Sequence, residues 1–328
     1  MKKSLRSRLF SAPVPLILLP LILFVSSLSG YAITYQESKL AQEDINLIPY
    51  PQEVIFNDQD FIMGEDISIV LDKEATENDR FAATILAENL LNDHHIKTQI
   101  TDFPSGKSII LSRKSADKKL GDQGYSLVVS SEEINLKANE EPGLYYGVQT
   151  ILQLIKKDDS SSFIKGLEIK DWPDIESRAV HYDTKHHQDT KEYVKTFIQD
   201  LARYKINLLV WEWEDKLAYP SHPEIGAPGA FTVEEMQELT HFAKKHHIQL
   251  VPLVQGLGHV SFILKWPQYA HLREIPASNW EFCPLKEGSY ELLFDLWEDA
   301  LEATTGSEYI HIGSDETYEL GLCPQCKA

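Results

Sequence analysis

The stretch that decides the fold is residues 309–316, which read Tyr-Ile-His-Ile-Gly-Ser-Asp-Glu. It is a short apolar run that ends in two adjacent carboxylates, Asp315 and Glu316. Successive side chains on a strand point to opposite faces, so both carboxylates can serve one pocket only where the strand stops and the backbone bends. Such strand ends carry the chemistry of α/β barrels. The pair therefore favours a barrel with a carboxylate site over an exposed acidic turn.

The residues before this stretch alternate between buried strands and amphipathic helices from Ile175 onward. We expect strands at 178–183, 207–213, 249–255 and 309–313, and helices at 191–204, 232–246 and 290–304. Thr232 and Glu235 have the spacing of a capping box, which marks a helix start. Continuous apolar strands separated by single helices predict a parallel sheet. The predicted fold class is α/β, a (β/α)8 TIM barrel of which this chain holds about the first four units.

A small α+β domain is expected before the barrel, at residues 45–170. Its strand-like runs lie at 67–71, 108–111, 125–129 and 134–137, and its helices at 77–92 and 143–156. Residues 171–174 read Asp-Trp-Pro-Asp and break the pattern, because proline disfavours a helix before it. The barrel region is therefore 171–328. The first domain shows no convergent cluster of titratable groups, so we expect it to support the barrel.

The N-terminus has the order of a secretory signal peptide. Its first ten residues carry Lys2, Lys3, Arg6 and Arg8, followed by an apolar run at 15–25 and small residues up to Ala32. The run is short and contains prolines, which favours cleavage over a membrane anchor. We expect a signal peptide at 1–32, a polar leader at 33–44, and export to the periplasm or the medium. Membrane attachment is expected only if the signal segment stays uncleaved.

The net charge and the number of cysteines limit which partners and cofactors we expect. The formal net charge of −19 excludes a polyanion such as nucleic acid as the expected partner. Three cysteines, Cys283, Cys323 and Cys326, are too few for a disulfide scaffold. Cys323-Pro-Gln-Cys326 has the spacing of half a zinc site, but structural zinc takes four ligands and no second pair is present. We therefore expect no metal or other cofactor, and a local disulfide or free thiols at this pair.

Several motifs together resemble one enzyme family. Residues 311–316 match the pattern His-x-Gly-x-Asp-Glu, and residues 47–52 and 143–154 look like the start and end of a non-catalytic N-terminal domain. Residues 252–259 and 270–274 resemble one branch of that family in particular. The pattern resembles glycoside hydrolase family 20, the β-N-acetylhexosaminidases, and within it the hexosaminidase D-like branch. The resemblance covers nearly everything after Ile45.

The resemblance implies a substrate-assisted mechanism, an exception to the scheme with a carboxylate nucleophile. Glu316 would be the general acid and then the base, and Asp315 would hold the acetamido N–H while the substrate's own carbonyl oxygen closes an oxazolinium ring. The implied activity is exo-acting hydrolysis of terminal non-reducing β-linked N-acetylhexosamine residues. The implied partners are glycans or oligosaccharides that contain N-acetylhexosamine.

Further residues are candidate substrate ligands by the same match. Arg178 corresponds to an arginine that grips sugar hydroxyls, since its fork of donors suits a diol, with a strand-end salt bridge as the alternative. Asp183 matches the aspartate of the first-strand motif. His259 matches a histidine near the acid, although Gln255 stands where its usual aspartate partner lies.

The end of the second strand and the loop after it supply the remaining candidates. Trp211 or its neighbour Trp213 is expected to line the pocket, although tryptophan is more often a core residue. Glu214 and Asp215 are candidate substrate ligands, with a solvated loop as the equal alternative because charged residues are mostly exposed.

Two other functions and one structural expectation stay open. A carbohydrate-binding relative without turnover is disfavoured because both Asp315 and Glu316 are present. A chitinase-like endo-glycosidase is disfavoured because that family spaces its acids as Asp-x-Glu. Half a barrel leaves two unpaired parallel edges, which are an aggregation liability, so we expect this chain to be part of a longer protein.

Overall fold

The computed structural model describes residues 38–64, 67–114, 116–158 and 161–328. The expected signal peptide and nearly all of the polar leader lie outside the described residues. Within the described part, no helix is both long and apolar enough to cross a membrane. Residues 39–328 belong to one unit, which begins with the short helix α1 (Lys39–Gln42).

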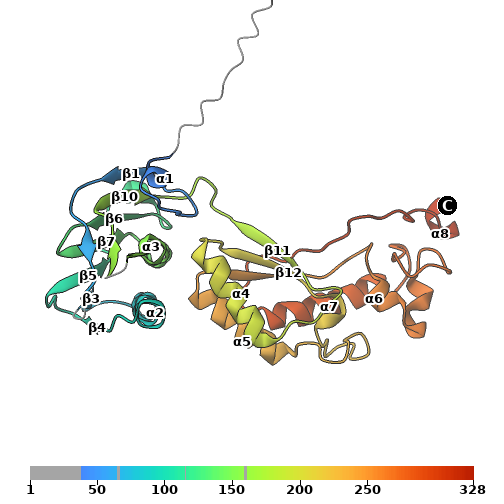
Figure 1. Cartoon of the computed structure of the whole chain (residues 1–328). Coiled ribbons are helices and arrows are strands. Elements are labelled where there is room, and N and C mark those ends of the chain that lie inside the picture. Colours follow the sequence, from blue (N-terminus) through green and yellow to red (C-terminus); the bar gives the residue numbers. More distant parts are fainter. Residues whose placement is uncertain (1–37, 65–66, 115, 159–160) are drawn as a thin grey trace, which may run out of the picture. The chain divides into compact units, whose positions relative to one another are not determined.

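The first domain is built on a seven-stranded sheet with the order β1-β10-β6-β7-β5-β3-β4 (Figure 1). The strands β3, β4, β5 and β7 are parallel, whereas β1, β10 and β6 join antiparallel. Their bounds are Glu53–Phe56 for β1, Ile67–Leu71 for β3, Thr98–Thr101 for β4, Lys107–Ser112 for β5, Tyr125–Val129 for β6, Glu133–Ala138 for β7 and Leu167–Asp171 for β10. A separate small sheet contains β2 (Phe61–Ile62), β8 (Lys156–Lys157) and β9 (Ser162–Ile164).

Two helices, α2 (Glu77–His94) and α3 (Glu141–Leu154), pack against each other and against this sheet. A capping box starts α2, because Thr76 Oγ1 accepts from Asp79 N at 3.2 Å while Asp79 Oδ2 accepts from Thr76 N at 2.9 Å. A single turn of 3₁₀-helix lies at Lys118–Leu120. The expected strands and both expected helices of this domain are present, with their ends shifted by at most two residues.

The second part is a parallel sheet of β11 (Ala179–Asp183), β12 (Leu208–Glu212) and β13 (Gln249–Leu253). Helices α4 (Lys191–Arg203), α5 (Val233–Lys245) and α7 (Ser289–Ala303) follow the three strands. Thr232 and Glu235 form the expected capping box of α5. The prediction of parallel strands alternating with helices is confirmed. Short elements complete the region: η2 (Glu214–Lys216), α6 (Ser261–Leu264), η3 (Pro267–Leu272) and α8 (Pro324–Lys327).

The expected fourth strand at 309–313 is reduced to one bridge. His311 pairs with Leu253, since His311 N donates to Pro252 O at 2.9 Å and Val254 N donates to His311 O at 3.2 Å. Among the residues that the structure describes, no strand pairs with the other side of this segment. The pairing does not extend further, because β13 ends at Leu253 on one side of this bridge and Pro252 has no backbone N–H to donate on the other. The segment nevertheless runs parallel to β13, as predicted.

The two faces of this sheet have different surroundings. Tyr182 and Trp211 lie on the helix face, where Tyr182 packs on Phe197 of α4 with 4.9 Å between ring centroids. Asp183 and Glu212 pair in register and point to the opposite face, the inner face of a barrel. This alternation decides which side chains can reach a site inside the barrel.

We predict that the chain self-associates through this open sheet. Alternate residues of β11 are exposed, and Tyr309 and Ile312 keep 55% and 49% of their surfaces in solvent. Unpaired, partly apolar strand edges recruit other strands. The mean mass from light scattering should exceed that of a monomer and rise with concentration, and Ile312→Lys should lower it. Leu91→Lys, at an exposed apolar residue of α2, is the matched control. A monomer at every concentration would contradict this prediction.

Candidate active site

A chain of hydrogen bonds crosses the carboxyl ends of the strands. The buried carboxylate of Glu212 accepts from Gln255 Nε2 at 2.7 Å and lies 2.9 Å from His181 Nε2. Gln255 Oε1 in turn accepts from Ser314 N at 3.1 Å. Because Ser314 directly precedes Asp315, this chain fastens the loop with the carboxylate pair to the ends of β12 and β13.

The structure brings Asp315, Glu316 and His259 together at this end of the sheet. His259 Nε2 lies 3.1 Å from Glu316 Oε2 and 3.4 Å from Asp315 Oδ2. The ring nitrogen is not aligned for a hydrogen bond to either oxygen, so these contacts are ionic when the ring is protonated. The side chains of Asp315 and Glu316 are 64% and 51% exposed and are therefore open to a substrate.

Trp280 is a further member of this group that the sequence did not single out. Its ring lies 4.5 Å from that of His259, measured between centroids, and its Nε1 donates to Glu316 O at 2.9 Å. Trp280 belongs to the long loop after β13, which has no periodic pattern to orient its side chains. Only the folded contacts reveal that this indole supports the carboxylate loop.

The backbone at the site is strained. His259, Ser314 and Glu316 have φ values of 57°, 79° and 51°, in the left-handed region that residues other than glycine rarely adopt. Such residues each cost on the order of 1–3 kcal/mol and gather at functional sites. Gly258 lets the two loops touch, because a Cβ there would lie 2.3 Å from Asp315 O. Close loop contact therefore holds the carboxylate pair in an otherwise unfavourable conformation.

The loop after β12 places Glu214 and Asp215 at the same end of the sheet. Burial, together with the nearby charge of Glu212, raises the pKa of Glu214 to about 7. Burial also acts to raise the pKa of Asp215, but Lys216 and Lys265 outweigh it and hold that pKa below its usual value. Glu214 is thus the carboxyl group of this loop that takes up a proton near neutral pH.

This raised pKa predicts a pH-dependent contribution of Glu214 to stability. The folded protein binds the proton more tightly than the unfolded chain, whose pKa is near 4.5. The contribution is complete below pH 4.5 and is lost as the pH rises through about 7. Glu214→Gln should therefore raise the free energy of unfolding at about pH 8 and change it little at about pH 4.

Urea denaturation at both pH values measures this difference. Glu298→Gln, at an exposed carboxylate of α7, is the control and should show the same small effect at each pH. An equal effect of Glu214→Gln at the two pH values would contradict the raised pKa.

Asp183 also lies at the carboxyl end, as expected, and is joined to Glu212 by a lysine. Lys185 Nζ lies 3.0 Å from Asp183 Oδ2 and 3.4 Å from Glu212 Oε1. Burial acts to raise the pKa of Asp183, but its hydrogen bonds from Lys185 outweigh burial and lower it. Glu212 and Lys185 were not predicted. Strand alternation contained the signal for Glu212, because it pairs with Asp183 and shares its face.

Arg178 is not brought to this site. It precedes β11, so it lies at the amino end of the strand, about 16 Å along the chain from Asp183 at the rise of a strand. Its Nε donates to Lys205 O at 2.7 Å and its Nη2 to Gln123 Oε1 at 2.7 Å. Its Nη1 donates to two further backbone carbonyl oxygens. In this structure Arg178 ties backbone segments together, and its contact with a sugar stays a prediction.

Trp211 and Trp213 do not line an open pocket either. They are 1% and 0% exposed. Trp211 packs against Tyr182 and Phe231, and its Nε1 donates to Thr184 Oγ1 at 3.0 Å. Its position on the helix face follows from alternation, because its neighbour Glu212 points to the inner face. The expectation of a pocket-lining indole at these positions is corrected.

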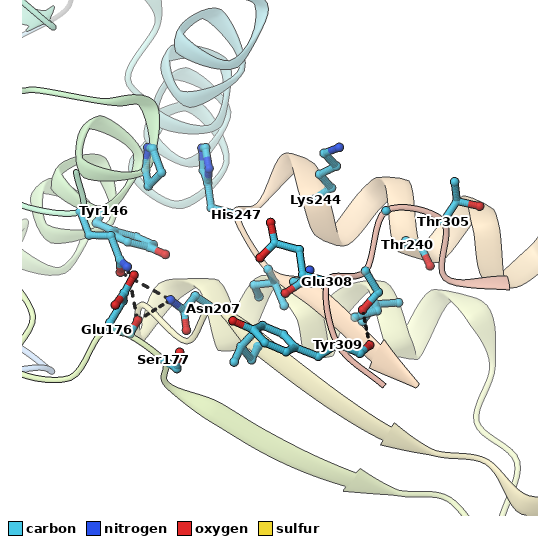
Figure 2. A pocket seen from close by; sticks show the side chains of 18 residues that line it. Tyr146, Glu176, Ser177, Asn207, Thr240, Lys244, His247, Thr305, Glu308 and Tyr309 are labelled. Atoms are coloured by element: carbon cyan, nitrogen blue, oxygen red, sulfur yellow. Dashed lines mark hydrogen bonds between the residues drawn. The ribbon is translucent and has the colours of Figure 1, made fainter. Parts of the chain in front are cut away.

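A cavity of about 530 Å³ lies at the other end of the strands (Figure 2). Figure 2 shows Asn207, which precedes β12, donating to Glu176 O at 2.8 Å, with Tyr309 and Glu308 also in the lining. Residues at the amino ends of barrel strands serve stability rather than chemistry. This cavity is therefore separate from the carboxylate site.

Family models match both domains of the chain. Residues 44–172 match the family model described as glycosyl hydrolase family 20, domain 2, and residues 176–328 match the catalytic domain of the same family. The beta-hexosaminidase of Porphyromonas gingivalis is 26% identical over 306 residues, which cover 83% of this chain and 39% of that protein. Human hexosaminidase D is 31% identical over 148 residues, which cover 45% of this chain and 30% of that protein.

A solved structure shows the same fold. The chitobiase of Flavobacterium johnsoniae superposes with a TM-score of 0.75 at 24% identity, over 87% of this chain and 47% of that chain. The chain thus spans less than half the length of these three relatives. The two matched models together cover most of the described residues and include the Asp315–Glu316 loop. The chain belongs to glycosyl hydrolase family 20.

Proposed function

We propose that this chain carries the acid-bearing part of an exo-acting β-N-acetylhexosaminidase. The enzyme would remove terminal non-reducing β-linked N-acetylhexosamine residues from glycans or oligosaccharides. The observation that carries the proposal is the meeting of Asp315, Glu316 and His259 at the carboxyl ends of the strands. Relatives from Porphyromonas gingivalis and Vibrio furnissii, both named beta-hexosaminidase, support the substrate class.

The first step breaks the glycosidic bond without a protein nucleophile. Glu316 donates a proton to the leaving oxygen as the C1–O bond breaks. The carbonyl oxygen of the substrate's acetamido group bonds to C1 and closes an oxazolinium ring. Asp315, on the adjacent position of the same loop, accepts the acetamido N–H and balances the positive charge of the ring.

The second step returns the site to its starting state. The Glu316 carboxylate takes a proton from a water molecule, and the water oxygen bonds to C1 as the ring opens. Two displacements at C1 leave the product in the β-configuration. Since the substrate supplies the nucleophile, the protein contributes positioning and electrostatics, which the strained and cross-linked loop of Asp315 and Glu316 provides.

The other carboxylates at this end are proposed substrate ligands. Asp183 is a partly exposed carboxylate that can accept from a sugar hydroxyl. Glu214, with its pKa of about 7, can present a protonated oxygen that donates to a hydroxyl. Asp215 is paired with Lys216 and Lys265, so its contact with a sugar would compete with those lysines.

We also propose that the enzyme acts outside the cytoplasm. The support is the order of charged, apolar and small residues in 1–32, with Ala32 as the end of the signal. Glycans, rather than nucleic acids, fit the net charge of −19. Immunoblotting of cell fractions for the processed N-terminus tests this part of the proposal, and a cytoplasmic, unprocessed protein would overturn it.

Hydrolysis by the purified chain tests the activity. We expect turnover of aryl β-N-acetylglucosaminide or β-N-acetylgalactosaminide and none of aryl β-glucoside, which lacks the acetamido nucleophile. An oligosaccharide of β-linked N-acetylglucosamine should release single sugars from its non-reducing end. Internal cleavage would favour the endo-glycosidase alternative. A chain that is folded by circular dichroism and turns over none of these substrates would contradict an activity of this chain.

A further inference from the structure

A second cluster of reactive side chains lies apart from the carboxylate pair. The sulfur of Cys283 lies 3.5 Å from that of Cys323 and 3.5 Å from that of Cys326. The sulfur of Cys326 lies 3.6 Å from Glu274 Oε2. One ligand atom from each of the four residues falls within 4.8 Å of every other. Three sulfurs and one carboxylate oxygen therefore surround a common point.

The spacing of these atoms fits a tetrahedral zinc ion. Zn–S bonds of about 2.3 Å and Zn–O bonds of about 2.0–2.2 Å place neighbouring ligands roughly 3.5–3.8 Å apart in a tetrahedron. The observed separations of 3.5, 3.5 and 3.6 Å lie in this range. A disulfide needs sulfurs about 2.05 Å apart and joins only two of the three cysteines. The geometry thus favours a metal over a disulfide.

The burial of these residues and the charge of Glu274 also favour a bound metal ion. Glu274 and Cys283 are 0% exposed and Cys323 is 5% exposed. In the described ranges, no lysine, arginine or histidine forms an ion pair with Glu274. Buried charges are normally paired or coordinate a metal, because an isolated one costs several kcal/mol. A divalent cation would supply the positive charge that this carboxylate needs.

Surrounding hydrogen bonds already orient the ligands. Glu274 Oε1 accepts from Cys323 N at 2.8 Å, which leaves Oε2 toward the three sulfurs. Cys326 N donates to Cys323 Sγ at 3.2 Å, and Cys283 N donates to Leu272 O at 2.9 Å. Hydrogen bonds that hold the ligands in this way fix their orientation and tune the metal.

We propose that Glu274, Cys283, Cys323 and Cys326 bind one structural Zn²⁺ ion. All four positions come from the protein, so the site is closed and has no open position for a reacting water. The ion would fasten the segment after Glu316 to the loop after β13. That loop also carries Trp280, which donates to Glu316 O. The proposal revises the sequence expectation of no metal, because Cys283 and Glu274 complete the set that Cys323 and Cys326 begin.

Metal content is the first test, and it is independent of any hydrolase activity. The chain is purified with reductant from a zinc-containing medium and passed over a chelating resin to remove loosely bound metal. Elemental mass spectrometry then measures the zinc that stays bound to the protein. We expect about one zinc per chain in the parent and in Glu319→Gln, a carboxylate on the same segment that is outside the ligand set. Cys326→Ser should lose nearly all of it, and Glu274→Gln most of it.

Cobalt substitution is the second test. It includes a measurement on the parent protein, so the proposal can be tested even if a variant fails to fold. Refilling the metal-free parent with Co²⁺ should give the intense visible absorption of a tetrahedral thiolate complex, with the same spectrum in Glu319→Gln. Glu274→Gln should shift or abolish the band. Parent protein with no zinc and no such band, or with a Cys–Cys cross-link in non-reduced peptide mass spectra, would overturn the proposal. Zinc retained in both Cys326→Ser and Glu274→Gln would overturn it as well.

Discussion

Replacing Glu316 by glutamine is expected to lower kcat/KM on a phenyl N-acetyl-β-glucosaminide by about 10²–10⁴-fold, the usual value of general acid–base catalysis. Phenolate is a poor leaving group, so its departure would depend on the proton that Glu316 is proposed to donate. The loss on a dinitrophenyl glycoside, which leaves without protonation, should be much smaller. This dependence on the leaving group distinguishes loss of the acid from general damage to the site.

Initial-rate kinetics on both glycosides measure the effect. Glu308→Gln makes the same change at an exposed residue at the amino end of the same segment and should leave both rates unchanged. Equal losses on the two glycosides in Glu316→Gln would contradict the assignment of Glu316 as the acid. Unchanged rates on both would contradict any role for this residue in the reaction.

Breaking the buried ion pair between Lys205 and Asp171 is expected to be the most destabilising single change. Lys205 Nζ lies 2.7 Å from Asp171 Oδ2 and 2.9 Å from the Tyr125 hydroxyl. Tyr125 also donates to Asp171 Oδ2 at 2.9 Å. Lys205 and Asp171 are 5% and 7% exposed, so removing one leaves the other charge buried and unpaired. Lys205→Met should therefore lower the free energy of unfolding by about 3–5 kcal/mol.

Urea denaturation of a double-mutant cycle tests this pair. Lys205→Met and Asp171→Asn should each be strongly destabilising, and the double variant should be less so than the sum of the two. The control is Lys191→Met, since Lys191 pairs at 2.8 Å with Glu238 at the surface and an exposed pair is worth about 0–1 kcal/mol. Equal small effects of Lys205→Met and Lys191→Met would contradict the account of the buried pair.

The elements with strong periodicity could be predicted from the sequence. The helices α4, α5 and α7 and the strands β11, β12 and β13 appear at the expected places, because an apolar stripe or run needs only its own residues to be recognised. The segment at 309–313 differs, because its pairing with β13 stops after the one bridge at His311. A local apolar run does not show how far the neighbouring strand can pair with it.

The sequence indicates which site residues are neighbours in the chain, but it does not show at which end or on which face of a strand each side chain lies. Asp315 and Glu316 follow the end of a segment beside β13, and His259 meets them there. Arg178 directly precedes β11, whereas Asp183 is its last residue, so the two lie at opposite ends of the strand. Trp211 and Glu212 are neighbours that point to opposite faces. A motif match identifies such residues, but it does not show at which end of a strand or on which face of the sheet their side chains lie.

The proposed zinc cluster shows the limit of local spacing most clearly. Cys323 and Cys326 can be recognised as half a site, but Glu274 and Cys283 lie some forty to fifty positions earlier in the chain. Their approach depends on how the loop after β13 folds back, which includes the single antiparallel bridge between Arg273 and Phe282. Contacts of this range follow from the tertiary fold rather than from any window of sequence.

The most direct measurement of the central claim uses substrates whose N-acyl group carries zero to three fluorine atoms. Fluorine withdraws electrons from the carbonyl oxygen and weakens it as a nucleophile while the leaving group stays the same. If the substrate closes an oxazolinium ring, kcat/KM should fall steeply with each added fluorine. A rate that does not change along the series would show that the acetamido group does not attack C1 and would contradict the account.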